Sequence, residues 1–176
     1  MGEVYYGIHE EIAKMLTKKH NLTHFVETGT WHGDSAKWAS SRFEQVITIE
    51  IIMEYHSQAR YELLSYNNVF CVYGDSREIM SQIVLSLIEK QTLFWLDAHW
   101  TGHPDYKKEY GKCAVIEEIE AINKSPQKNA IMVDDVRLFP SLMKVEPSRV
   151  IELLSNDGRR KVTVKDDIFY AEPNGD

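Results

Sequence analysis

The sequence predicts an α/β fold: a doubly wound, mostly parallel sheet with helices on both faces and a C-terminal antiparallel hairpin. Two observations support this fold class. Short apolar runs rich in β-branched and aromatic residues alternate with stretches of helical period through most of the chain. The last apolar segment instead holds two strand-like pieces around an Asp-Asp pair, which indicates a hairpin. The 176 residues suffice for one core, so we expect a single domain over residues 1–176.

Five apolar runs are the predicted strands of the parallel part, and we expect them to be buried. They are THFVET, QVITIEI, NVFCVYG, TLFWLD and AIMVDD. The stretches between them carry apolar residues at helical spacing. These predicted helices are SAKWASSRF, EYHSQARYELLSY, REIMSQIVLSLIEK and AVIEEIEAIN, and one more, HEEIAKMLTKKH, precedes the first strand.

The C-terminal part is predicted to be a helix near SRVIELLSN followed by the hairpin KVTVKDDIFYAEP, with Asp166 and Asp167 at its turn. The least regular stretch of the chain is AHWTGHPDYKKEYG, residues 98–111, which joins a predicted strand to a predicted helix. A long polar and aromatic loop at the C-terminal end of a strand is a common position for functional residues.

The composition argues against two kinds of partner. The net charge is −7 and no long Lys or Arg block occurs, so we expect neither nucleic acid nor a membrane as a partner, because both favour a basic surface. Two cysteines, Cys71 and Cys113, give no sign of a disulfide framework, and we expect Cys71 to be a small buried hydrophobe. With no apolar signal core at the N-terminus, we expect a soluble protein of the cytoplasm.

Each predicted parallel strand ends in or next to an acidic residue. In open parallel sheets, ligands bind beyond the C-terminal ends of the strands. A single acid at such a position is commonly a helix cap or a turn residue. Five strand ends that bring carboxylates to one edge indicate a binding site instead. The acids are, in chain order, Glu27, Glu50, Asp75, Asp97 and the pair Asp134–Asp135.

The first strand runs into a glycine-containing turn, in the segment FVETGTWHGDSAKW. Gly29 and Gly33 permit positive φ angles and a close approach of the backbone to a ligand. A nicotinamide or flavin site would read G-x-G-x-x-G, but bulky Thr30 and Trp31 stand where that turn needs no side chain. An NAD-dependent oxidoreductase is therefore the less favoured alternative. Glu50 stands where an acid would accept hydrogen bonds from two ribose hydroxyls.

These residues resemble the class I S-adenosylmethionine-dependent methyltransferases, in particular the catechol O-methyltransferase-like branch, which includes the metal-dependent O-methyltransferases of macrolide and aminocoumarin sugars. The resemblance covers residues 23–139 and rests on VETGTWHGDSA, TIEI, VYGDSREIM, FWLDAHW and IMVDD, in that order. The same pattern is similar to small bacterial methyltransferase-like proteins. It implies a Rossmann-like sheet and S-adenosylmethionine as the cofactor.

The resemblance also implies which residues bind this cofactor. Glu27, Gly29 and Gly33 would line its methionine end, Glu50 would hold the ribose, and Asp75 with Ser76 would border the adenine. The remaining cofactor-binding residues implied are Thr30, Ser35, Ile51 and Asp97.

A magnesium site of Asp97, Asp134 and Asp135 is implied in the same way, with Asp135 standing where many relatives have Asn. Mg²⁺ prefers carboxylate and water ligands, and at a substrate hydroxyl it would lower the pKa of that oxygen and orient it toward the methyl group. Whether Asp135 binds the metal directly stays open. The lysine that serves catechol-type relatives as a general base is missing, so His99 or His103 is the candidate catalytic base, with a structural loop histidine as the alternative for each.

Two hypotheses about function follow. The first is an S-adenosylmethionine-dependent, Mg²⁺-assisted O-methyltransferase acting on a small hydroxylated molecule. The second is a non-catalytic module of the same fold that binds cofactor or metal, which the missing lysine and the thin cover over the site favour. The same thin cover allows a homodimer in which a second subunit completes the substrate wall.

Two further interpretations concern charged residues near the site. We expect Arg137 to pair with a neighbouring carboxylate rather than with a substrate. Glu117, Glu118 and Glu120 lie on one predicted helix, and their spacing indicates an exposed acidic face.

Overall fold

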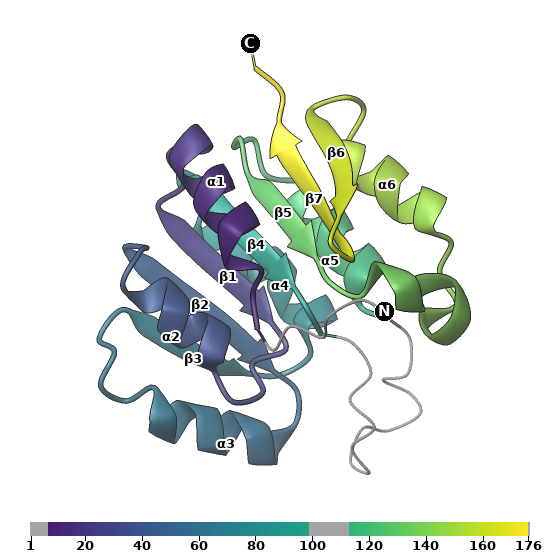
Figure 1. Ribbon diagram of the computed structural model, residues 1–176. Coiled ribbons are helices and arrows are strands. Elements are labelled where there is room, and N and C mark those ends of the chain that lie inside the picture. The colour runs from purple at the N-terminus through teal and green to yellow at the C-terminus, as the bar shows by residue number, and fades with distance from the viewer. Residues whose placement is uncertain (1–6, 99–112, 176) are drawn as a thin grey trace.

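The computed structural model describes residues 7–98 and 113–175, and its central feature is a seven-stranded sheet (Figure 1). The strand order is β3-β2-β1-β4-β5-β7-β6. Strands β1 to β5 pair in parallel, and β7 runs antiparallel to both β5 and β6. The predicted fold class is therefore confirmed. The strands are β1 (His24–Thr28), β2 (Gln45–Glu50), β3 (Val69–Tyr73), β4 (Thr92–Leu96), β5 (Ala130–Val133), β6 (Arg160–Lys165) and β7 (Ile168–Pro173).

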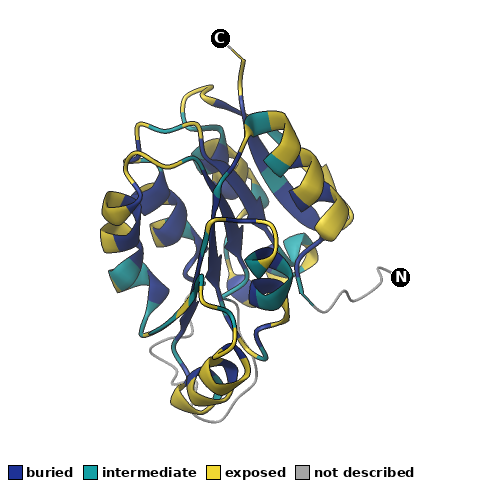
Figure 2. Ribbon diagram, turned by 90° about the vertical axis from the view of Figure 1, so that its left-hand side faces the viewer, coloured by how far each residue is buried: buried dark blue, intermediate teal, exposed yellow. Residues whose placement is uncertain are grey.

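Two apolar layers hold helices against the two faces of this sheet. One cluster joins residues of α1, α2 and α3 to one face, and the other joins residues of α4, α5 and α6 to the opposite face. Figure 2 shows the buried sheet between helices whose outer sides are exposed. No helix of the described part is long and apolar enough to span a membrane. The helices are α1 (Glu10–His20), α2 (Asp34–Ser40), α3 (Met53–Glu62), α4 (Ser76–Ser86), α5 (Val115–Ile122) and α6 (Pro147–Ser155).

The strands differ in burial according to their place in the sheet. Every residue of β1 and β4 is buried, because both strands lie between two neighbours and under helices on both faces. The prediction that all five strands are buried is wrong for β3, which pairs only with β2 and leaves Phe70 50% exposed. Cys71 on this strand is accordingly only partly buried. An apolar run in a sequence does not distinguish an edge strand from a central one.

The C-terminal hairpin forms where it was predicted. Strands β6 and β7 are joined by Asp166 and Asp167, whose φ angles are 51° and 66°. A two-residue hairpin turn with positive φ at both positions matches the right-handed twist of the strands, and Asp tolerates this conformation. The hairpin completes the sheet beside β5, so the turn lies next to the end of that strand.

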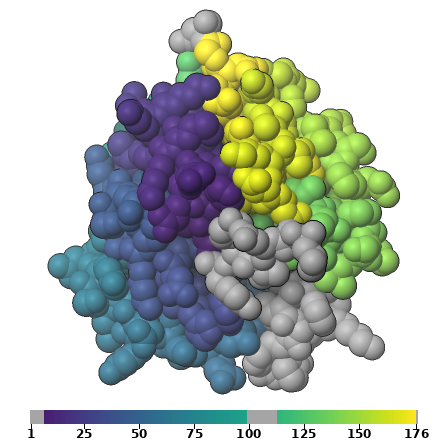
Figure 3. Space-filling model, viewed as in Figure 1, coloured from purple at the N-terminus to yellow at the C-terminus, as the bar shows by residue number. Residues whose placement is uncertain are grey.

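The two ends of the described chain pack against each other. Figure 3 shows the purple N-terminal segment beside the yellow C-terminal one. Glu172 on β7 pairs with Lys19 at 2.5 Å and with His20 at 3.1 Å, both in the last turn of α1. Burial would raise the pKa of Glu172, but the hydrogen bonds and charges of Lys19 and His20 hold it below its usual value.

Two short helices after β5 were not predicted. Residues Val136–Leu138 form the 3₁₀ helix η2, and Phe139–Met143 form a π-type turn, η3. The segment is too short to show a helical period in the sequence, and π turns are frequent near functional sites. Its role here is to carry the chain from the acidic end of β5 to α6.

Candidate functional site

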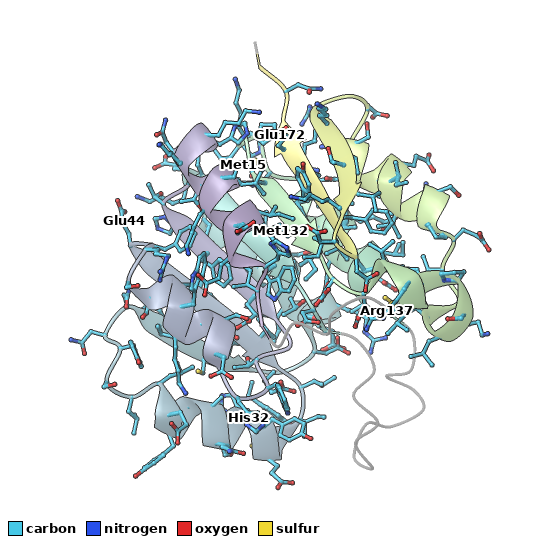
Figure 4. The ribbon with its side chains drawn as sticks, viewed as in Figure 1. Met15, His32, Glu44, Met132, Arg137 and Glu172 are labelled. Atoms are coloured by element: carbon cyan, nitrogen blue, oxygen red, sulfur yellow. The ribbon has the colours of Figure 1, made fainter. Side chains whose placement is uncertain are left out.

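The parallel strands bring their acidic ends to one edge of the sheet. The register pairs Thr28 of β1 with Ile49 of β2 and with Leu96 of β4, and Leu96 with Val133 of β5. The acids that follow these residues therefore lie side by side at one edge. In Figure 4, His32 in the glycine turn and Arg137 after β5 lie toward this end, while Glu44 lies toward the other.

The turn after β1 is shaped by its two glycines. Gly29 has a φ of 82°, and a Cβ atom there would lie 2.6 Å from the backbone oxygen of Asp97. Gly33, with a φ of 78°, is the N-cap residue of α2, and its N–H donates to the carbonyl of Thr30 at 2.8 Å. Trp31 between them also has a positive φ, 45°, which is rare for a bulky residue. The turn is thus tight, and it leaves Trp31 exposed, with its ring in a tilted contact with the ring of His32.

Glu50 at the end of β2 anchors this turn. Its Oε2 accepts a hydrogen bond from the backbone N–H of Trp31 at 3.0 Å, and its Oε1 accepts one from the N–H of Ile52 at 2.8 Å. Each carboxylate oxygen keeps a further lone pair for another donor. The side chain is therefore held in one orientation at the position where a ribose diol is expected.

Glu27 lies beneath the turn in a chain of hydroxyl groups. Thr48 donates from its Oγ1 to Glu27 Oε2 at 2.7 Å, and the hydroxyls of Thr30 and Thr48 are 2.6 Å apart. Burial raises the pKa of Glu27 to about 8, although the hydroxyls of Thr48 and Ser35 oppose this shift. Glu27 is therefore protonated near neutral pH in the cofactor-free protein. Sequence reasoning missed Thr48, whose place in the middle of an apolar strand was its one available signal.

Asp97 and Asp134 lie at the neighbouring ends of β4 and β5, directly after the paired residues Leu96 and Val133. Burial raises the pKa of Asp97 well above its usual value, and the charge of Asp134 raises it further. Burial likewise raises the pKa of Asp134 to about 6. Both carboxyl groups thus bind their protons more tightly than free side chains do. A cation bound beside them would favour their ionised forms.

Asp135, the third acid of the implied metal site, is engaged elsewhere. Its Oδ1 lies 2.7 Å from Arg137 Nη2, and Arg137 also pairs with Asp167 of the hairpin turn. The interpretation of Arg137 as the partner of a neighbouring carboxylate is confirmed. The backbone of Asp135 is in the left-handed region, with a φ of 58°, and its N–H donates to Asp134 Oδ1 at 2.7 Å.

The donors at this edge suit a hard divalent cation in kind, because Asp97 and Asp134 offer carboxylate oxygens. Within residues 7–98 and 113–175, however, no three His, Cys, Asp or Glu side chains come together closely enough to hold a metal ion. A metal here would be held by Asp97 and Asp134 first. The direct role of Asp135 stays a prediction.

Asp75 is occupied as a helix cap. Its Oδ1 accepts a hydrogen bond from the N–H of Arg77 at 3.0 Å at the start of α4, and its carboxylate pairs with the Arg77 guanidinium. Although burial acts in the opposite direction, these contacts hold the pKa of Asp75 below its usual value. Ser76, the first residue of α4, is buried beside it. At the predicted border of the adenine site, the Asp75 carboxylate is therefore held in place as the N-cap of α4.

Glu118 on α5 is buried, with only 1% of its surface exposed. The prediction that it belongs to an exposed acidic face is wrong, although Glu117 and Glu120 are exposed as expected. The available signal was spacing: Glu118 stands three residues after Val115 and four before Ile122, so it shares their apolar face. Burial raises the pKa of Glu118 to about 7.

The two predicted catalytic residues follow β4 in the sequence. His99 and His103, the candidate catalytic residues, lie outside the described residues, as does nearly all of the segment 98–111.

Ile51, a predicted cofactor-binding residue, lies between Glu50 and Ile52, whose backbone N–H donates to the Glu50 carboxylate. Its role in cofactor binding stays a prediction.

Replacing Glu27 by Gln should flatten the pH dependence of stability. The pKa of Glu27 is about 8 in the folded protein against 4.5 for a free side chain, so the folded state binds this proton more tightly. The stabilisation that comes from protonated Glu27 is therefore complete at pH values below 4.5, and it is lost as the pH rises toward about 8. The slope for one group is at most about 1.4 kcal/mol per pH unit.

Urea denaturation of the cofactor-free protein from about pH 5 to about pH 8 measures this effect. The free energy of unfolding should fall more steeply in wild type than in Glu27→Gln. Parallel curves for the two proteins would show that Glu27 is ionised in the folded state.

Several solved structures have an architecture similar to that of this chain, although its sequence alone matches no known family. No family model and no curated protein matches the sequence. Among solved structures, a candidate O-methyltransferase from Klebsiella pneumoniae aligns with a TM-score of 0.68 at 17% identity, over 99% of this chain and 84% of its own. A candidate caffeoyl-CoA O-methyltransferase from Staphylococcus aureus gives 0.66 at 16% identity, over 98% of this chain and 86% of its own.

A third similar structure was solved with S-adenosylhomocysteine bound. This candidate methyltransferase from Streptococcus mutans aligns with a TM-score of 0.61 at 12% identity, over 97% of this chain and all of its own. At such identities the likeness concerns the fold. This chain therefore has the fold of the class I S-adenosylmethionine-dependent methyltransferases.

Proposed function

We propose that this protein is an S-adenosylmethionine-dependent methyltransferase that transfers a methyl group to a hydroxyl oxygen of a small molecule with the help of a divalent cation such as Mg²⁺. The observation that carries the proposal is Glu50. Its carboxylate is fixed by two backbone N–H groups, one of them from the glycine turn, and still has acceptor capacity for two ribose hydroxyls. Both oxygens are thus fixed at the position where the ribose is expected.

The other residues fit distinct parts of the cofactor. The tight turn at Gly29 brings backbone close to the space beyond β1, where the methionine half would lie. Glu27, beneath it, would accept a hydrogen bond from the amino group of that half once ionised. When bound, S-adenosylmethionine would supply an electrophilic methyl group for the substrate oxygen, and a base of this chain would take the proton of that hydroxyl.

The support for metal assistance is the pair Asp97 and Asp134. A bound divalent cation would supply Lewis acidity that lowers the pKa of the substrate hydroxyl. The two carboxylates would hold it, since burial and their mutual repulsion raise the pKa of Asp97, and a cation would offset both effects. His99 or His103 is the proposed acceptor of the hydroxyl proton.

A second candidate function has one observation in its favour. Asp135 is paired with Arg137, so the three implied metal ligands are not all directed at one point. A module of this fold that binds the cofactor without turnover would need no complete metal site. The two candidates make different predictions for the same experiment.

The test combines calorimetric titration with S-adenosylhomocysteine and a transfer assay with radiolabelled S-adenosylmethionine and a panel of small catechols and hydroxylated sugars. We expect binding with or without Mg²⁺, and methyl transfer that is lost when EDTA removes the metal. Asp134→Asn should keep its affinity for S-adenosylhomocysteine and lower transfer by about 100-fold. Binding without transfer under any condition would favour the non-catalytic module, and no binding would reject both candidates.

A further inference from the structure

Glu118 occupies a position that packing alone would give to an apolar residue. Its neighbours on the same face of α5 are Val115, Ile119 and Ile122, all of them in the apolar cluster beneath the sheet. Both carboxylate oxygens of Glu118 are inaccessible, and within the described part of the chain neither has a hydrogen-bond partner. A buried polar group in this condition destabilises the fold. Stability therefore does not explain why an acid stands here.

The surroundings of Glu118 belong to the candidate cofactor site. The hydroxyls of Ser76, at the start of α4, and Thr28, at the end of β1, lie close enough to lower its pKa against the effect of burial. Neither meets the geometry of a hydrogen bond with it, and Thr28 Oγ1 itself has no partner among the described residues. The carboxylates of Asp75 and Asp97 also act on it electrostatically. Buried polar groups from three elements thus gather at the cofactor edge without satisfying one another.

The two hydroxyl residues connect Glu118 to the adenosine half of the site. Ser76 is adjacent to the cap residue Asp75, in the segment expected to border the adenine. Thr28 directly precedes Gly29, where the chain leaves the sheet for the glycine turn. A small shift of either residue would let its hydroxyl donate to Glu118, because both already lie beside the carboxyl group. Such a shift would move the two backbone segments between which the cofactor is expected.

We propose that Glu118 is a positioning residue that sets the adenosine half of the cofactor site through Ser76 and Thr28, at a cost in stability to the cofactor-free protein. This inference rests on the proposed cofactor. It predicts a particular combination of effects: removing the carboxyl group should strengthen the fold and weaken cofactor binding. A residue with a purely structural role would lower both together.

The test uses Glu118→Leu, with Glu117→Leu, the exposed neighbour on the same helix, as its matched control. Glu118→Leu should raise the thermal midpoint by about 3 °C. It should also weaken binding of S-adenosylhomocysteine by about tenfold. The loss should be equal for 5′-methylthioadenosine, which lacks the amino-acid half, because the effect lies on the adenosine side. Glu118→Gln, which can still accept hydrogen bonds, should restore most of the affinity. The control should change neither quantity.

Thr28→Val is the second variant, and it decides the matter if Glu118→Leu does not fold. It removes an unpartnered buried hydroxyl with little change of shape, so it too should weaken binding without lowering stability. Unchanged affinity in both variants would overturn the inference, as would a joint loss of stability and affinity. If wild type binds S-adenosylhomocysteine and the variants bind equally well, only this inference fails. If wild type does not bind it, the proposed function fails first.

Discussion

Glu50→Ala is expected to weaken the binding of S-adenosylhomocysteine by at least about 100-fold, because hydrogen bonds to a charged acceptor each contribute about 1.5–3 kcal/mol. The variant would lack the carboxylate and therefore its hydrogen bonds to the ribose. The backbone N–H of Trp31, now without its acceptor, would no longer hold the glycine turn in place. Isothermal titration calorimetry of folded protein measures the loss directly.

Two variants make this result interpretable. Glu44→Ala removes an exposed acid just before β2, at the opposite end of the strand from Glu50, so it controls for the change in net charge. Glu50→Gln keeps one acceptor oxygen and the shape of the side chain, and it should give an intermediate affinity. If Glu50→Ala bound S-adenosylhomocysteine as tightly as Glu44→Ala does, the ribose would have to lie elsewhere, and the proposed function would lose the observation that carries it.

The parallel part of the fold could be predicted because its local signals agree with one another. Each apolar run of the sequence became a strand, and each stretch of helical period became a helix on one face of the sheet. The edge position of β3 could not be predicted, since strand order follows from packing between distant segments. The short helices after β5 were missed because three to five residues show no period.

The candidate site was predictable to the extent that it depends on where strands end. Glu27, Glu50, Asp97 and Asp134 lie at the predicted edge because parallel strands place their C-terminal ends together. What each acid does there depends on partners that the sequence does not show. Asp135, for example, is paired with Arg137, a contact that neither residue's position in the sequence specifies.

Burial is the property that sequence interpretation estimated least well at this site. Three glutamates on one helix resemble a solvated face, but the helix presents one of them, Glu118, to the core. A buried acid is rare enough that the exposed interpretation is the natural default. In the structure Glu118 is buried, because the apolar residues spaced around it on the helix face the core. The sequence contains this spacing, but the three neighbouring charges obscure it.

Gly29→Ala is expected to destabilise the fold by about 3 kcal/mol or more, since it combines backbone strain with a collision. A Cβ atom at Gly29 would lie 2.6 Å from the backbone oxygen of Asp97 and 2.9 Å from its carbonyl carbon, so a rotamer change could not relieve the contact. The matched control is Gly158→Ala. Its φ of 81° is nearly equal to the 82° of Gly29, but no atom lies within 4 Å of the added carbon. The control should therefore cost only the strain, about 1 kcal/mol.

Urea denaturation measures the free energy of unfolding that each variant loses. The difference between the two losses gives the contribution of the close contact between Gly29 and the end of β4. The sequence alone assigned Gly29 to a close approach between backbone and ligand, but the structure adds that this residue already touches the segment that carries Asp97. Displacing that segment would move one of the two acids proposed to hold the metal, so methyl transfer should fall more than cofactor affinity does. Equal destabilisation by the two substitutions would mean that β1 and β4 can separate freely at this edge. In that case the glycine serves the ligand rather than the packing of the two strands.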